Sequence, residues 1–206
     1  LYPEPTYFFF AADLPELLYY SHISSIVIAL LVGLFVFLNG KTFLLNRLLL
    51  VIAACFSLWT LSSLISWTNI HSDFMLFIWT FFNILSSLIS ISCIYFIYIF
   101  AGKGDISIKL KVIFLTLLAP VIFFSPTSFN ISGFNITNCD AFEFQYLPFE
   151  IYYTSLGVLA MIWIFILLTR LYRNATADFK KQIILVGTGV ELFLLSFLSM
   201  GFLASY

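Results

Sequence analysis

Residues 180–206 read KKQIILVGTGVELFLLSFLSMGFLASY, and this stretch decides the fold class. After Lys180, Lys181 and Gln182, the 24 residues of 183–206 carry a single charge, Glu191. The hydrocarbon core of a bilayer needs roughly 20 apolar residues in a helix, at about 1.5 Å each, so we predict a membrane-spanning helix. Lysine and arginine beside a span favour the cytoplasmic side, so the two lysines predict that this span starts in the cytoplasm.

The composition of the whole chain agrees with this interpretation. Hydrophobic residues make up 62% of the 206 positions and charged residues only 9%, against about 25% in a typical soluble domain. The chain is therefore predicted to be a polytopic membrane protein. It has no basic tract that would indicate binding of nucleic acid. Its three cysteines, Cys55, Cys93 and Cys139, are scattered and predict neither a disulfide framework nor a metal site.

Long apolar stretches recur along the chain and predict an all-α transmembrane bundle in a single domain, residues 1–206. Three basic loops, at 39–46, 101–111 and 172–182, alternate with polar stretches that lack Lys and Arg. Pro120 is expected to kink or end its span. The longest polar stretch, 125–148, is predicted to be an outer loop. The six predicted spans cover residues 17–38, 44–67, 74–100, 106–124, 149–171 and 183–206.

The distribution of charges predicts an orientation. With the amino terminus outside, all nine basic residues fall on the cytoplasmic side and seven of the ten acids on the outer side, as the positive-inside rule requires. Six spans then place Tyr206 outside, so a cytoplasmic output domain would need a seventh span. The chain also starts without Met, and we expect it to be a segment of a longer protein. The basic residues are Lys41, Arg47, Lys103, Lys109, Lys111, Arg170, Arg173, Lys180 and Lys181.

Glu191 is the only acid predicted to lie deep in hydrocarbon, and two interpretations of it are open. An ionisable group inside a membrane is costly and often functional, so Glu191 is a candidate sensing carboxylate facing the bundle interior. Alternatively, it only helps helices to pack, for example by a hydrogen bond to Asn83 or to a serine. Gly187 and Gly189, just before it, would let another helix approach closely.

A second group of polar side chains lies in the predicted third span. Ser86 and Ser90 are four residues apart, and so are Ser62 and Ser66 in the predicted second span, so each pair shares a helical face. Small hydroxyl residues are typical of helix–helix contacts in membranes. The alternative is a polar pocket lined by such hydroxyls and by Asn83. We therefore select Glu191, Asn83 and Ser87 as the candidate intramembrane polar site.

The outer loop contains aromatic residues interleaved with Asn, Ser and acids. Phe134, Phe142 and Tyr146 are expected either to fold over the mouth of the bundle or to act as a lid above a ligand site. Asn130 and Asn135 each begin an Asn-x-Ser/Thr glycosylation pattern, which is common by chance and matters only in a secretory pathway that uses it.

No arrangement of residues in the sequence predicts catalysis. It contains no HExxH or CxxC motif and no Gly-rich phosphate loop beside a lysine, and we see no Ser-His-Asp set. His22 and His71 lack companion ligands, so no metal site is predicted. We expect a segment that is not itself an enzyme and that needs no cofactor.

Several features between residue 43 and the end form one layout. They are a longer outer loop between spans four and five, Asn46-Arg47-Leu48 after the first turn, Trp59, Trp79, and the basic stretch 170–181 followed by Gln182 and Gly187 or Gly189. This layout resembles the seven-helix amino-terminal sensor region of bacterial histidine kinases. That resemblance implies a seventh helix leading to a cytoplasmic kinase, cyclase or similar output domain, neither of which this sequence contains. It also implies a homodimer of the full-length protein in the bacterial cytoplasmic membrane.

Taken together, these patterns predict the membrane-embedded input module of a signal-transduction protein. It would read an external or intramembrane stimulus of unknown chemistry. The alternative is a small multi-pass transporter or channel subunit, which is expected to show inverted repeats or broken helices at matching positions. Pro120 and the Gly187/Gly189 pair, the interruptions that we compare, do not stand at matching positions.

Overall fold

The computed structural model describes residues 15–69, 72–102, 104–130 and 147–203, which form six α-helices. Backbone amides in hydrocarbon have no water to bond, so each long apolar stretch satisfies them within a helix. The predicted all-helical fold is confirmed for these residues. The helices are α1 (Glu16–Asn39), α2 (Leu44–Thr68), α3 (Ser72–Gly102), α4 (Ile108–Phe124), α5 (Leu147–Asn174) and α6 (Ala177–Leu203).

All of these helices except α4 are long and apolar enough to cross a membrane. With 17 residues, α4 lies at the lower limit for a spanning helix. Pro120 lies inside α4 and does not end it, because the helix continues to Phe124. The start of α4 is capped by Ser107, whose side chain accepts a hydrogen bond from the amide of Leu110.

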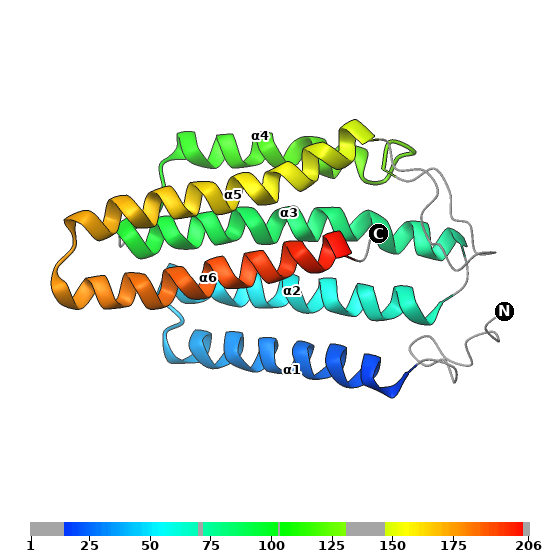
Figure 1. The fold of residues 1–206 in the computed structure, drawn as a ribbon, viewed down its shortest axis with the longest axis horizontal. Coiled ribbons are helices and arrows are strands. Elements are labelled where there is room, and N and C mark those ends of the chain that lie inside the picture. Colours follow the sequence, from blue (N-terminus) through cyan, green and yellow to red (C-terminus); the bar gives the residue numbers. More distant parts are fainter. Residues whose placement is uncertain (1–14, 70–71, 103, 131–146, 204–206) are drawn as a thin grey trace.

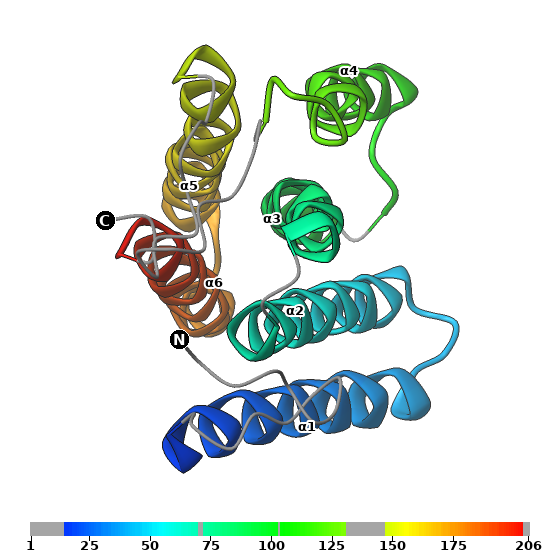
Figure 2. The ribbon, with the colours of Figure 1, turned by 90° about the vertical axis from the view of Figure 1, so that its right-hand side faces the viewer.

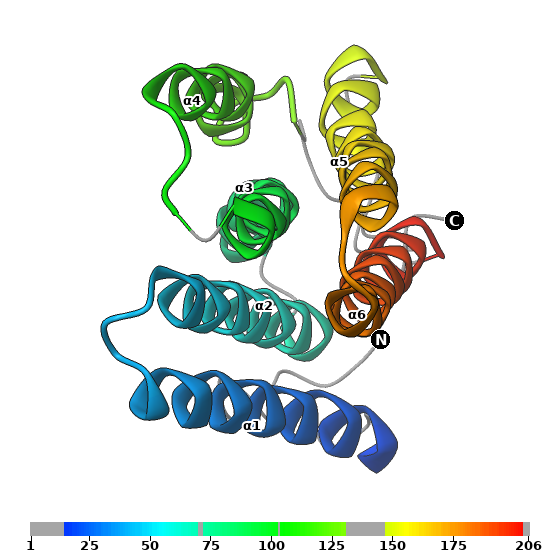
Figure 3. The same ribbon diagram turned by 90° about the vertical axis from the view of Figure 1, so that its left-hand side faces the viewer.

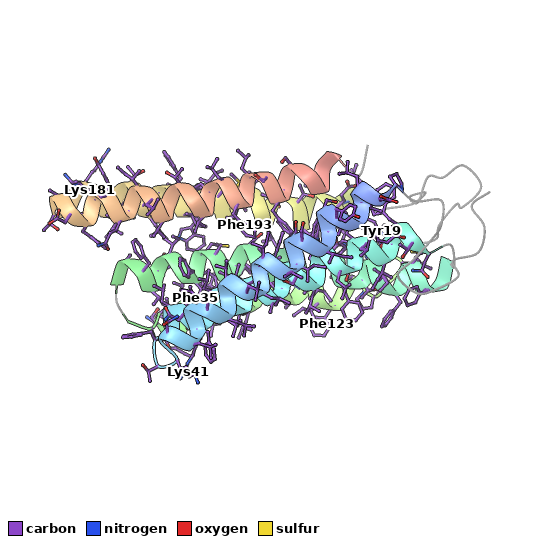
Figure 4. All side chains as sticks on the ribbon, turned by 90° about the horizontal axis from the view of Figure 1, so that it is seen from below. Tyr19, Phe35, Lys41, Phe123, Lys181 and Phe193 are labelled. Carbon is purple, nitrogen blue, oxygen red and sulfur yellow. The ribbon has the colours of Figure 1, made fainter. Side chains whose placement is uncertain are left out.

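The helices run alternately up and down, and this arrangement collects the basic residues that the structure describes at one end. The α1–α2, α3–α4 and α5–α6 connections all lie at the left in Figure 1. In Figure 4, Lys41 and Lys181 lie at this end and Tyr19 at the other. We call the first of these the basic end and the other the opposite end.

One predicted loop is mostly helical. The sequence predicts a basic loop over 172–182, but α5 continues to Asn174 and α6 begins at Ala177. Arginine, lysine and glutamine are good helix formers, and their polar groups can reach water from a helix end, so charge does not stop either helix. Only Ala175 and Thr176 connect α5 to α6.

The core surrounds α3. Viewed along the bundle in Figures 2 and 3, α3 lies among α2, α4, α5 and α6, with α1 outside α2. Its side chains Ile89, Ile97 and Cys93 are fully or almost fully buried, as are Ile164 of α5 and Leu194 of α6. The outer faces of the other helices expose large apolar side chains, as a surface in contact with lipid does.

Aromatic rings fill the space between α2 and α6. Phe56 and Trp59 of α2 meet Phe193 and Phe197 of α6, with ring centroids 5.5 Å apart for Phe56–Phe193 and 4.7 Å apart for Trp59–Phe197. Trp59 also meets Phe82 of α3 at 5.5 Å, edge to face. This cluster joins three helices, and edge-to-face pairs of this kind are favourable beyond the area they bury.

By contrast, α1 contacts α2 alone among the described helices. Its one buried residue is Gly33, and a Cβ added there would lie 2.8 Å from the Cβ of Ala53. The absence of a side chain at Gly33 therefore allows the two helices to pack closely.

Replacing Gly33 with Ala is expected to push α1 away from α2 and to lower the free energy of unfolding by about 1–3 kcal/mol. Gly189 of α6 is a matched control, because nothing lies within 4 Å of a Cβ added there. Gly189→Ala should leave stability unchanged or raise it. Unfolding in mixed micelles by titration with a denaturing detergent measures both. Equal effects at the two positions would contradict close packing at Gly33.

Candidate functional site

Two buried asparagines connect α3 to the turn that follows α4. The side-chain amide of Asn83 donates a hydrogen bond to Oδ1 of Asn130, with the two atoms 2.6 Å apart. In turn, Nδ2 of Asn130 donates to the carbonyl of Ser125 at 3.1 Å. The asparagines are only 5% and 3% exposed, respectively. Bonds between buried amides fix a specific arrangement, because separating them would leave polar groups unpaired. We call Asn83, Asn130 and Ser125 the asparagine latch.

Ser87 lies one helical turn further along α3 than Asn83, toward the basic end. Its hydroxyl is buried and has no hydrogen-bond partner among the described residues, and the same is true of the hydroxyl of Ser125. Most other buried or half-buried hydroxyls of α2 and α3 donate to a carbonyl of their own helix, as Ser90 does to Ser86. Ser87 therefore differs from its neighbours, and it lies close to the latch along the helix.

Glu191 lies deeper in the bundle, on the face of α6 that packs against α5 and α3. On its own helix it lies one turn after the buried Gly187 and three residues before the fully buried Leu194. Its Oε1 atom is buried and has no hydrogen-bond partner among the described residues. It lies within electrostatic range of the Cys93 thiol on α3.

The register of α5 against α6 determines the level of Glu191 along the bundle. Leu168 fills the space at Gly187, and Leu198 fills the space at Gly157. The helices run in opposite directions, so Glu191 lies at the level of Ile164, a fully buried residue at the centre of the core. Gly189 is in open space, and so only Gly187 of the pair serves close packing.

The residues grouped from the sequence therefore form two separate sites. Asn83 and Ser87 belong to the latch region, whereas Glu191 lies deeper in the bundle, at the level of Ile164 and within electrostatic range of Cys93. Asn83 and Cys93 are ten residues apart on α3, about 15 Å along its axis. No hydrogen bond between Glu191 and either Asn83 or a serine is present among the described residues. The predicted lid residues Phe134, Phe142 and Tyr146 lie outside the described residues.

Sequence reasoning missed a polar cluster at the basic end. Asp105, between α3 and α4, accepts hydrogen bonds from the Tyr95 hydroxyl on α3 and from the Lys111 ammonium on α4, each at 2.5 Å. The backbone amide of Ile106 also donates to it, at 2.7 Å. We call Asp105, Tyr95 and Lys111 the aspartate knot. An aspartate six residues before a lysine, where one helix follows another, was the available signal, but the Tyr95 contact depends on how α3 and α4 pack.

The aspartate knot also shifts the acidity of its carboxyl. Hydrogen bonds donated by Lys111, and then by Tyr95, lower the pKa of Asp105 below its ordinary value. A cavity of about 250 Å³ opens beside the knot, and its walls include Tyr98, Ser107 and Leu110.

Among the described residues, no group of His, Cys, Asp and Glu could hold a metal ion. His22 instead joins α1 to α2, with Nε2 3.3 Å from the Ser63 hydroxyl.

Tyr152 adds a third polar contact to α4. Its hydroxyl, on α5, donates to the carbonyl of Leu117 at 2.8 Å, three residues before Pro120. α4 is thus hydrogen bonded to α5 near its middle. It is also connected to α3 at two places: through the aspartate knot at its first turn, and through the asparagine latch after its last turn. The apolar contribution of α4 to the core consists of Phe114, Leu118 and Val121.

Replacing Glu191 with Leu is expected to raise the free energy of unfolding by about 1–3 kcal/mol, because it removes a buried oxygen without a partner. Denaturation in detergent micelles measures the change. Glu191→Gln, which keeps a polar group of similar size, should change stability little. A loss of stability in Glu191→Leu would instead show that the carboxyl helps the helices to pack.

The contribution of the aspartate knot should depend on pH in one direction. A lowered pKa stabilises the fold fully above the ordinary aspartate pKa, near 4, and this contribution is lost as the pH falls through the lowered value. The difference in thermal midpoint between wild type and Asp105→Asn is expected to be constant above about pH 5 and to shrink below about pH 4. Asp178→Asn controls for loss of one exposed acid. A difference that persists at the lowest pH would contradict the assignment.

Comparison of the chain with known protein families, with curated proteins and with solved structures finds no match. The resemblance to histidine-kinase sensor regions therefore gains no support from relatives, and the function has to be argued from the bundle itself.

Proposed function

We propose that this chain is the membrane-embedded input module of a bacterial signal-transduction protein in the cytoplasmic membrane. The observation that carries the proposal is the bonding of α4 to α3 near both of its ends. The latch follows the last turn of α4, and the knot includes Lys111 in its first turn. A helix that polar contacts hold near both of its ends can transmit a movement from one end to the other.

In this proposal the amino terminus and the opposite end face outward and the basic end faces the cytoplasm. Asn130 is the last described residue before 131–146, which would form the outer loop. A ligand or a change in the bilayer that moves this loop would pull on Asn130 and break its bond to Asn83. The released α4 would shift against α3 and α5, a change between two packings of the kind that switches signalling proteins.

Such a shift would reach the basic end through the knot, where a cytoplasmic output domain receives it. Kinase or cyclase chemistry would belong to that domain, and the proposal gives this chain no catalytic step. Homodimers of the full-length protein are the expected working form.

One observation favours a second candidate, a small transporter or channel subunit. Glu191 holds a buried, unpartnered carboxylate oxygen in the interior of the bundle. Intramembrane carboxylates of this kind mark ion and proton pathways. Proteoliposomes that contain only this chain separate the two candidates. Ion or proton flux that Glu191→Gln abolishes would establish the second candidate and contradict the first.

The sensor proposal predicts that breaking the latch changes the far end of α4. Nitroxide labels at Lys109→Cys on α4 and Arg170→Cys on α5, both exposed at the basic end, report the distance between these helices by pulsed electron paramagnetic resonance. Asn130→Ala is expected to broaden or shift the distance distribution. Asn83→Ala, which removes the same bond from the α3 side, should have the same effect.

Thr127→Val is the matched control, because the Thr127 hydroxyl bonds only within the turn after α4: it donates to the carbonyl of Phe124 and accepts from the amide of Phe129. It should leave the distance distribution as in the wild type. If both asparagine variants also keep the wild-type distribution while folding normally, α4 does not transmit changes from one end to the other, and the sensor mechanism is wrong.

A further inference from the structure

The α5–α6 turn carries a cluster of cations. Arg170 and Arg173 lie in the last turns of α5, and Lys180 and Lys181 in the first turns of α6, on either side of a two-residue connection. The one acid between them is Asp178. The ion pair that the described residues contain is Lys111–Asp105, which joins α4 to the connection before it, so no carboxylate among the described residues pairs with this cluster. The cluster has a net charge of +3.

Two of these cations face away from the bundle. Arg173 lies seven residues after Ile166, and therefore on the same face of α5, where Ile166 is 44% exposed. Lys181 lies four residues before Leu185, on the same face of α6, where Leu185 is 77% exposed. Each charged side chain thus continues a stripe of apolar side chains that faces lipid.

The position of the cluster along the bundle matches the headgroup region. From Ile166 to Arg173 is about 10 Å along the helix axis, and from Leu185 to Lys181 about 6 Å. Tyr172 lies between the two arginines in the sequence and is half-exposed. The ammonium of Lys180 lies over its ring, 5.1 Å from the ring centre. Tyrosine is enriched where hydrocarbon meets headgroups, and long cationic side chains reach outward from there.

Phe179 holds the start of α6 in place. Its ring packs against Phe100 near the end of α3, with centroids 5.5 Å apart. The lysines that follow are therefore carried on an anchored helix. A preorganised group of cations without acidic partners suits a phosphate-bearing ligand, since guanidinium groups bind phosphate oxygens through two parallel hydrogen bonds.

We infer that Arg173 and Lys181, supported by Arg170 and Lys180, form a binding surface for the headgroups of anionic phospholipids at the basic end. The ligand supplies the phosphate and the negative charge that the chain lacks there. The attraction of one basic residue to an anionic membrane surface corresponds to about a fivefold factor in an association constant, and this sets the scale expected for the preference for a single charged headgroup.

The test uses the full chain in proteoliposomes of phosphatidylcholine that contain a trace of spin-labelled phosphatidylglycerol or spin-labelled phosphatidylcholine. Electron paramagnetic resonance gives the relative association of the two labelled lipids with the protein. The wild type is expected to favour phosphatidylglycerol severalfold. Arg173→Gln combined with Lys181→Gln should bring the ratio close to one. Arg173→Lys with Lys181→Arg, which keeps both charges, should retain most of the selectivity.

The control is Lys41→Gln combined with Lys109→Gln, which removes two exposed cations at the same end, one from the α1–α2 connection and one from α4. It should leave most of the preference in place. Equal loss in the two double variants would overturn the assignment, since a diffuse field would then explain the effect. A wild type without preference would also overturn it, and binding of an acidic soluble protein at the α5–α6 turn would then be the better explanation.

Discussion

Inside hydrocarbon every backbone amide must find its hydrogen-bond partner within the protein, and the rest of this structure follows from that requirement. Each apolar stretch becomes a helix, and the remaining freedom lies in how helices pack. Here α3 is surrounded by α2, α4, α5 and α6. Aromatic rings pack on the side of α3 that faces α2 and α6, and polar contacts connect α3 to the α4 side. The two sides thus differ in the kind of interaction that holds them.

The same requirement acts on side-chain hydroxyls. In α2 and α3, Ser66, Ser86 and Ser90 each donate to a carbonyl four residues earlier, and so most of the serine-rich character of these helices is satisfied locally. Hydroxyls bonded in this way are small, nearly neutral packing elements. This favours the helix-contact interpretation for most serines. Ser87 does not fit it, and its neighbour Asn83 bonds to another segment of the chain.

The sequence was sufficient for the helices and insufficient for the site. The length of the apolar stretches alone located the six helices, because a helix that crosses the hydrocarbon core of a bilayer needs a stretch of that length. It failed at 172–182, where lysine and arginine look like a loop yet stay helical. Glu191 was found because an acid in an apolar run is conspicuous. Its separation from Asn83 depends on the register between helices, which a sequence of uniform hydrophobicity does not encode.

The partner of Asn83 could not be found in this way, because Asn130 lies 47 residues further along the chain, in a turn. That partnership has a consequence wherever the chain is produced in a secretory pathway that attaches sugars to asparagine, such as that of a eukaryotic expression host. In Asn130-Ile131-Ser132 the atom that would receive a glycan is Nδ2, the same nitrogen that donates to the Ser125 carbonyl. Because it is buried and already bonded, the folded protein presents no acceptor there. Sugar attachment at Asn130 and closure of the turn after α4 are therefore mutually exclusive, and a glycan placed during translocation would prevent that turn from closing.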